Sequence, residues 1–178
     1  MVKHKYLLAA LAAGVTSVTS MPVYATTLEK VEFTDLVDQA SVIILGRAVD
    51  ADVTTVNGEL VTRTTFSVED VAAGDVGPTI MVHTPGGSIK NTKVRMGEVH
   101  PGVPVFARGT SAVLLLKSNN GDAYSVLGYN QGVFSVFNDG GVPSVNLPDG
   151  DDKPVAASRA MRQMQEMRDD DDFEDDDD

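Results

Sequence analysis

Two long runs of β-forming residues flank an Asn-Gly pair in the first half of the chain, and this arrangement constrains the fold more than any other feature. The first run is SVIILGRAVDADVTTV, residues 41–56, and the second is ELVTRTTFSVEDVAAG, residues 59–74. Asn57-Gly58 is a dipeptide that two-residue hairpin turns prefer, because both central residues of such a turn take a positive φ. The sequence therefore predicts a long antiparallel hairpin.

The two runs differ in their hydrophobic pattern. The first begins as a continuous apolar stretch, typical of a strand buried on both faces, and then alternates. The second alternates throughout, so that Leu60, Thr64 and Phe66 share one face while residues 61, 63, 65 and 67 form a wet face. Gly46 interrupts the first run and predicts a bend or bulge, as a small barrel requires.

The rest of the chain predicts further short strands and a helix near each end. The stretch 85–110 is long and irregular, and residues 138–154 are turn-rich and predict a linker with one short strand. Met161, Met164 and Met167 predict one apolar stripe that packs on the domain, with a copper(I) site as the weaker alternative. Strands are expected at 78–84, 111–118, 123–129 and 132–137, and helices at 34–40 (N-cap Thr34) and 155–168.

These elements predict a mainly β fold: a small five- to six-stranded barrel with a short N-terminal helix and a C-terminal helix. An open sandwich of two sheets is the alternative. The expected boundaries are a signal peptide at 1–25, the barrel domain at 26–148, a linker and terminal helix at 149–168, and a disordered acidic tail at 169–178.

The N-terminal segment predicts export. Lys3 and Lys5 precede the apolar run YLLAALAAGV, and Val23-Tyr24-Ala25 places small residues at the −3 and −1 positions of a cleavage site. The apolar run is shorter than the roughly 20 residues that cross a bilayer. The expected location is therefore secreted or periplasmic, without a transmembrane segment after cleavage. The chain has no cysteine, so disulfides cannot stabilise it and its core must.

The charge argues against nucleic acid as a partner. The formal net charge is −12, and the tail DDDDFEDDDD concentrates nine of the 26 acidic residues. Nucleic-acid phosphates need a positive patch, which this balance does not supply. The tail is expected to be extended and solvated. Binding of a hard cation by Asp169, Asp170, Asp171 and Asp172 is a weak alternative, and no cofactor is expected.

The stretch HTPGGSIKN, residues 83–91, holds the most suggestive polar residues. It lacks the GxxxxGK[ST] spacing of a phosphate loop. Ser88 and Lys90 are two residues apart, so a dyad on one face of extended chain is conceivable, but no base with an orienting partner is visible. Neither His83 nor His100 belongs to a zinc-binding motif. The stretch is therefore interpreted as a turn that opens a long loop, and no catalytic residue is assigned.

Several short motifs, taken in order, resemble a family of small exported bacterial domains. The resemblance covers Thr34 to Phe137. The motifs are Gly46-Arg47-Ala48, residues 68–74, Pro85-Gly86-Gly87, residues 109–116 and residues 128–134. The same layout is similar to the oligonucleotide/oligosaccharide-binding (OB) barrel of netrin-like domains, which include the inhibitory domain of tissue inhibitors of metalloproteinases.

The resemblance implies an inhibitor or accessory factor of a secreted zinc metalloprotease, because exported relatives of this kind are often found beside matrixin-like proteases. The animal inhibitors place an N-terminal cysteine on the catalytic zinc. This chain has no cysteine, and its mature form would begin at Thr26. Inhibition would therefore need another wedge, and the loop Pro85 to Pro104 is the candidate.

We therefore expect an exported binding domain without enzymatic activity, whose partner is another exported protein. Two alternatives remain open. One is a hydrolase that uses Ser88, Lys90 or His83, and the other is a surface protein that binds cations through its acidic tail. The candidate binding loop comprises Pro85, Gly86, Gly87, Ser88, Lys90 and His100.

Overall fold

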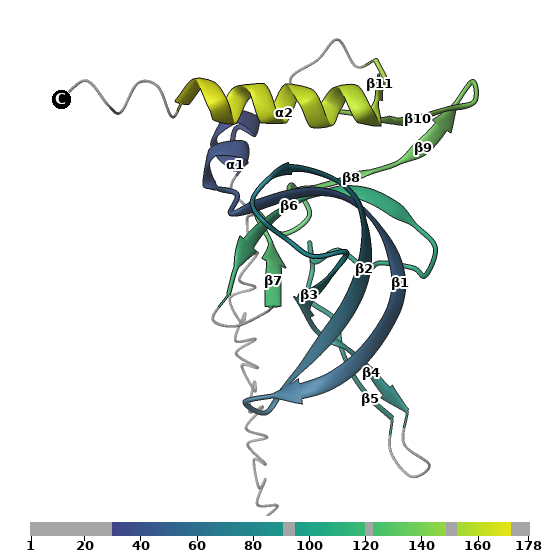
Figure 1. The fold of residues 1–178 in the computed structure, drawn as a ribbon. Coiled ribbons are helices and arrows are strands. Elements are labelled where there is room, and N and C mark those ends of the chain that lie inside the picture. The colour runs from purple at the N-terminus through teal and green to yellow at the C-terminus, as the bar shows by residue number, and fades with distance from the viewer. Residues whose placement is uncertain (1–29, 91–94, 120–122, 149–152, 172–178) are drawn as a thin grey trace, which may run out of the picture.

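The computed structural model describes residues 30–90, 95–119, 123–148 and 153–171. The predicted signal peptide and residues 172–178 of the acidic tail lie outside these ranges. The chain is mainly β with a helix near each end of the described part, as predicted (Figure 1). In chain order the elements are α1 (Phe33–Gln39), β1 (Val42–Val56), β2 (Glu59–Ala73), β3 (Thr79–Pro85), β4 (Gly87–Lys90), β5 (Arg95–Glu98), β6 (Ser111–Ser118), β7 (Ala123–Val126), β8 (Val133–Ser135), β9 (Phe137–Asp139), β10 (Val142–Val145), β11 (Val155–Ala156) and α2 (Ala157–Asp171).

Five strands form a ring-like sheet. β1, β2 and β3 make an antiparallel meander, β3 pairs in parallel with β7, and β7 pairs antiparallel with β6. An antiparallel pairing of β6 with the first half of β1 closes the ring, and β8 adds to β6 beside β7. β1 and β2 curve around this ring in Figure 1. β1 pairs with β2 along nearly its whole length, and its first half pairs with β6 as well.

The hairpin and bulge predictions are confirmed. Asn57 and Gly58 have φ of 52° and 90°, the two positive values that a tight two-residue turn needs. The register of β1 against β2 shifts between Leu45 and Gly46, and shifts again on either side of this step. Each bulge inserts an unpaired residue and increases the local twist, which bends the long strand into the ring.

Two hydrophobic clusters lie on the two faces of the ring, which explains the continuous apolar run of β1. Ile44 and Leu114 belong to the cluster inside the ring, together with Phe66. Ile43 precedes Ile44 on β1, Leu115 follows Leu114 on β6, and both belong to the cluster outside the ring. Successive side chains of a strand point to opposite faces, so a strand between two cores must be apolar at every position.

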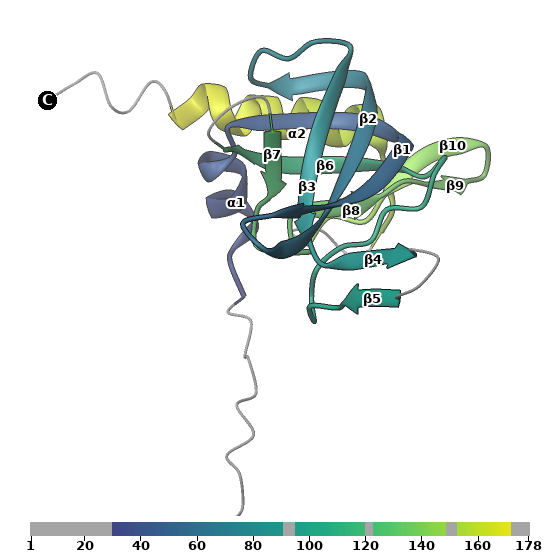
Figure 2. The same cartoon turned by 90° about the horizontal axis from the view of Figure 1, so that it is seen from below.

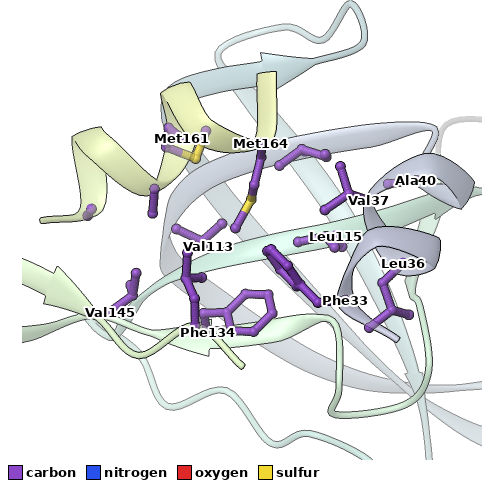
Figure 3. Packing of buried hydrophobic residues seen from close by; sticks show 14 residues of the cluster. Phe33, Leu36, Val37, Ala40, Val113, Leu115, Phe134, Val145, Met161 and Met164 are labelled. Atoms are coloured by element: carbon purple, nitrogen blue, oxygen red, sulfur yellow. The ribbon is translucent and has the colours of Figure 1, made fainter. Parts of the chain in front are cut away.

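The outer cluster joins both helices to the sheet. α1 contributes Phe33 and Val37, and α2 contributes Met161 and Met164, which are almost fully buried (Figure 3). The rings of Phe33 and Phe134 meet edge to face with centroids 5.6 Å apart. The predicted methionine stripe is therefore confirmed as packing. α2 belongs to the same core as the ring.

Two stretches contain more structure than the sequence predicts. Residues 85–110, expected to be irregular, include the β4–β5 hairpin, called here the arm. Residues 138–154, expected to be a linker with one short strand, contribute to a three-stranded sheet in the order β11–β10–β9. Val145 at the end of β10, and Leu147 just after it, are buried in the outer cluster. Neither stretch has strict alternation over more than four residues, so periodicity could not reveal them.

Several expected boundaries are wrong, including the start of the terminal helix, since Val155–Ala156 form β11 and α2 begins at Ala157. α1 begins at Phe33 after Glu32, so Thr34 lies inside the helix rather than at its N-cap. β7 ends at Val126 instead of residue 129, because Gly128 and Tyr129 take the left-handed conformation and turn the chain. α2 continues to Asp171, so the first three aspartates of the acidic run are helical.

Arg168 fastens α2 to the end of α1. Its Nη1 donates to the carbonyl oxygens of Asp38 (2.6 Å), Ala40 (3.1 Å) and Val37 (3.3 Å). Carbonyl groups at a helix C-terminus have no partner in the helix and carry partial negative charge, so a guanidinium there satisfies both requirements.

We expect Arg168→Met to lower the free energy of unfolding by about 1.5 to 3 kcal/mol, the range for hydrogen bonds to a charged group. Methionine keeps the apolar stem and removes the donors. Urea denaturation measures the change, with Arg162→Met as the matched control because Arg162 is exposed on the same helix. Equal effects of the two substitutions would contradict the role of Arg168.

Candidate functional site

Gly86 and Gly87 allow the start of the arm to pack closely against the ring. The Gly86 amide donates to the Leu60 carbonyl oxygen (2.7 Å), and Thr62 Oγ1 donates to the Gly86 carbonyl oxygen (2.8 Å). Gly87 has a φ of 132°, and a Cβ there would lie 2.6 Å from Thr62 Oγ1 and 2.8 Å from a methyl of Val53. Only glycine fits this crossing. The Pro-Gly-Gly turn is thus a structural device that positions the arm.

Glu98 and His100 form a second attachment at the base of the arm. His100 Nε2 lies 2.9 Å from Glu98 Oε1, and Glu98 Oε2 accepts a hydrogen bond from the Leu60 amide at 3.4 Å. A Cβ on Gly86 would lie 2.7 Å from the Glu98 carbonyl oxygen. The Pro-Gly-Gly turn and the base of β5 are therefore in direct contact. Of the predicted loop residues, the structure brings Gly86, Gly87 and His100 together here.

The remaining predicted residues do not converge. Ser88 is exposed and pairs with Gly97 across the arm. Lys90 ends β4 opposite Arg95, and its side chain lies outside the described part. His83 lies on β3, where Nε2 is 3.4 Å from the Met81 sulfur. Among the described residues, no hydrogen bond joins Ser88 to His83, so the geometry gives no support to a dyad.

His83 belongs instead to a polar row that crosses five strands. Direct cross-strand pairing places Lys117 opposite Ser125, Ser125 opposite His83, His83 opposite Arg63, and Arg63 opposite Asp52. Residues directly opposite each other in a sheet share a face. Arg63 and Asp52 form an ion pair of 2.5 Å on the outside of the ring, at the wet face that the alternation of β2 predicts.

A cavity of about 310 Å³ opens at the Lys117 end of this row. The end of β3, residues 103–104 and the turn after β7 surround it. Tyr129 stands at its rim, half exposed, with a φ of 60° that is uncommon for a residue with a side chain. The residues that line it are His83, Thr84, Pro85, Val103, Pro104, Lys117, Ser125, Val126, Leu127, Gly128 and Tyr129.

The surroundings of His83 favour the neutral form of its imidazole. Partial burial lowers its pKa below the ordinary value of 6.5, and the nearby Arg63 cation lowers it further, while Asp52 acts in the opposite direction. Burial and a like charge both disfavour the imidazolium. Near neutral pH the imidazole therefore presents one ring N–H donor and one acceptor nitrogen.

We expect the free energy of unfolding to fall as the pH decreases from 6.5 through the folded-state pKa of His83. Over this window the unfolded chain binds the proton more readily than the folded one, so acid favours unfolding. Denaturation at several pH values between about 7 and 5 tests this. His83→Gln should give a flatter profile, and an identical slope in the variant would contradict the assignment.

A larger groove of about 820 Å³ lies between β1, residues 104–112 and the β8–β9 segment. Its charged groups satisfy one another. Arg47 Nε binds Glu69 Oε1 at 2.9 Å, and Arg47 Nη1 donates to the Gly109 carbonyl oxygen at 3.2 Å. These contacts join β1 to β2 and to the segment before β6, so we assign Arg47 and Glu69 a structural role.

Within residues 30–90, 95–119, 123–148 and 153–171, no group of three His, Cys, Asp or Glu side chains could hold a metal ion. Asp169 and Asp170 are exposed near the end of α2, and the side chains of the other candidate aspartates are not described. Neither described helix is long and apolar enough to cross a membrane.

Comparisons with known proteins identify no relative. No protein family, no curated protein and no solved structure matches this chain. Any function must therefore be inferred from the fold and its surface.

Proposed function

We propose that this chain is an exported, non-enzymatic binding domain built on an OB-like barrel. The N-terminal pattern of residues 1–25 supports export. The ring order β1–β2–β3–β7–β6, closed by β1–β6, supports the OB-like assignment. In a five-stranded Greek-key barrel of that kind the third and fifth strands, counted along the chain, pair in parallel, as β3 and β7 do here. In such barrels the loops and the face of the second and third strands bind ligands.

The segment 99–105 is the proposed contact surface for a protein partner. Val99 and Val105 are 91% and 94% exposed, the highest values among the large hydrophobic residues that are exposed in the described part. They bracket a turn closed by the Val103 amide donating to the His100 carbonyl oxygen (3.3 Å). Exposed apolar side chains on a loop favour binding to another protein. This exposure is the observation that carries the proposal.

The proposed partner is a secreted zinc metalloprotease, which the chain would inhibit or assist. This part rests on the resemblance to netrin-like inhibitory domains. The shape supports it, because the arm, which leads directly into the segment 99–105, lies on the side of the ring away from α2 (Figures 1 and 2). An edge that the ring holds in place, on the side away from the helix, can meet a partner without disturbing the core.

Affinity capture tests the proposal. Mature protein 26–178 and a form ending at residue 168 are immobilised, and exported proteins of the source organism are passed over them at moderate salt. We expect both forms to retain a zinc protease and to change its activity. Retention of the protease by the longer form alone would assign binding to the acidic tail instead.

Single substitutions locate the contact. Val105→Ser should reduce retention of the protease, whereas Val142→Ser, at another exposed valine, should not. Equal retention by both variants would remove the segment from the interface. Failure of every form to retain a protease would reject the protein-partner proposal, and the hydrolase alternative would then be tested with Ser88→Ala.

A further inference from the structure

The small cavity beside His83 has the composition of a ligand site. Its volume of about 310 Å³ lies at the lower end of the range for small-molecule sites, about 300 to 1,000 Å³. Valine, proline, leucine and tyrosine side chains supply most of its wall, and His83, Lys117 and Ser125 supply a polar edge. A mostly apolar pocket with a few converging polar groups is the usual form of such a site.

The polar edge of the cavity favours an anion, because its charged group is a cation. Lys117, Ser125 and His83 are direct neighbours across β6, β7 and β3, with strands about 4.8 Å apart. Lys117 is exposed, and no ion pair joins it to another described residue. Farther along the row, Asp52 already neutralises Arg63. Among the described residues, the charge at the cavity that no ion pair neutralises is therefore the ammonium of Lys117, and the neutral imidazole of His83 offers an N–H donor.

The backbone conformation of Tyr129 is a second feature of the cavity that points to a ligand. Its φ of 60° is a left-handed backbone conformation, which is strained for a residue that is not glycine. The strain places an aromatic side chain, half exposed, at the rim of the cavity. An aromatic ring at this place offers a flat apolar surface to a ligand.

We propose that this cavity binds a small carboxylate-bearing ligand with an apolar body. The carboxylate is held by the Lys117 ammonium and the His83 N–H, and the apolar body lies against Val103, Leu127 and Tyr129. A free organic acid and the C-terminus of a peptide share this chemistry. The site goes beyond the protein contact proposed above and does not depend on it.

The test uses 15N-labelled mature protein and two pairs of probes followed by amide chemical shifts. One pair is 3-phenylpropionate and its amide, and the other is a short peptide ending in Leu-Phe with a free or an amidated C-terminus. We expect the free acids to cause saturable shifts at residues 117, 125 and 129. Each amide should bind at least about tenfold more weakly, the loss of one hydrogen bond to a charged group.

The two sources of a carboxylate are distinguished by comparing the acids. Tighter binding of the peptide acid than of 3-phenylpropionate would identify a chain terminus as the ligand, and equal binding would identify a small organic acid. Equal binding of acid and amide, or no saturable shift with millimolar probe, would overturn the proposal. Neither result bears on capture of a protease, so the two proposals fail separately.

Two variants link binding to the named side chains. Lys117→Met should weaken binding of the acids at least about tenfold, while Lys30→Met removes the same charge outside the cavity lining and should not. Tyr129→Gly relieves the backbone strain and removes the aromatic wall, so it should weaken binding without lowering the thermal midpoint. A variant that binds the acids as well as the wild type would contradict the assignment of its residue.

Discussion

A chain that ends at residue 154, and so lacks β11 and α2, should lose cooperative folding. Ala160, Met161 and Met164 are almost fully buried against α1 and the ring (Figure 3). Truncating a single buried methionine side chain costs about 2 to 5 kcal/mol, and the loss of two together approaches the whole stability of a typical domain, about 5 to 15 kcal/mol. Circular dichroism during urea unfolding measures the effect.

The matched control for this truncation is a chain that ends at residue 171. It retains every buried residue of α2 and removes seven residues that lie outside the described part. We expect its free energy of unfolding to stay within about 0.5 kcal/mol of the full mature chain. A cooperative transition of unchanged midpoint in the 26–154 form would show that the ring folds alone and that α2 is an appendage.

Local sequence patterns predicted the elements whose burial or dihedral requirement shows in neighbouring residues of the chain. The first part of β1 could be recognised as buried on both faces because Ile43 and Ile44 alternate between two cores. The Asn57-Gly58 turn could be recognised because its dihedral requirement falls on two adjacent residues. The terminal helix has a methionine at every third position, which places one face in the outer cluster.

The candidate site could not be predicted in the same way, because it depends on register between distant strands. Lys117, Ser125 and His83 become neighbours only when β3 pairs in parallel with β7. Parallel partners are joined by long crossovers, so no turn signal links them. Tyr129 carried a weak signal, since it follows Gly128, but a left-handed conformation at tyrosine is too uncommon to predict from sequence.

The Pro-Gly-Gly turn could be recognised from the sequence, whereas the need for its second glycine could not. The sequence indicated a turn that opens a long loop, and the structure has the turn. The reason for the second glycine is the close approach of Thr62 and Val53, which belong to other strands. Such contacts are set by packing between elements, and no local pattern records them.

Phe66→Ala should lower the free energy of unfolding by about 3 to 5 kcal/mol, the largest effect we expect from a single side chain. Phe66 is fully buried inside the ring, and its ring meets that of Phe106 edge to face with centroids 5.0 Å apart. The substitution removes apolar contact and leaves a cavity that strands closed into a ring cannot easily fill. Equilibrium denaturation in urea measures the loss.

Phe106 makes this substitution informative about the proposed contact surface as well. It follows Val105 directly, so its packing on Phe66 helps to hold the exposed segment 99–105 in place. We therefore expect Phe66→Ala to weaken capture of a partner under conditions where the variant is still folded. Phe137→Ala, at a phenylalanine 38% exposed, should cost less than about 1 kcal/mol and leave capture unchanged. Similar stability losses in the two variants would mean that the inside of the ring is not the close-packed core described here.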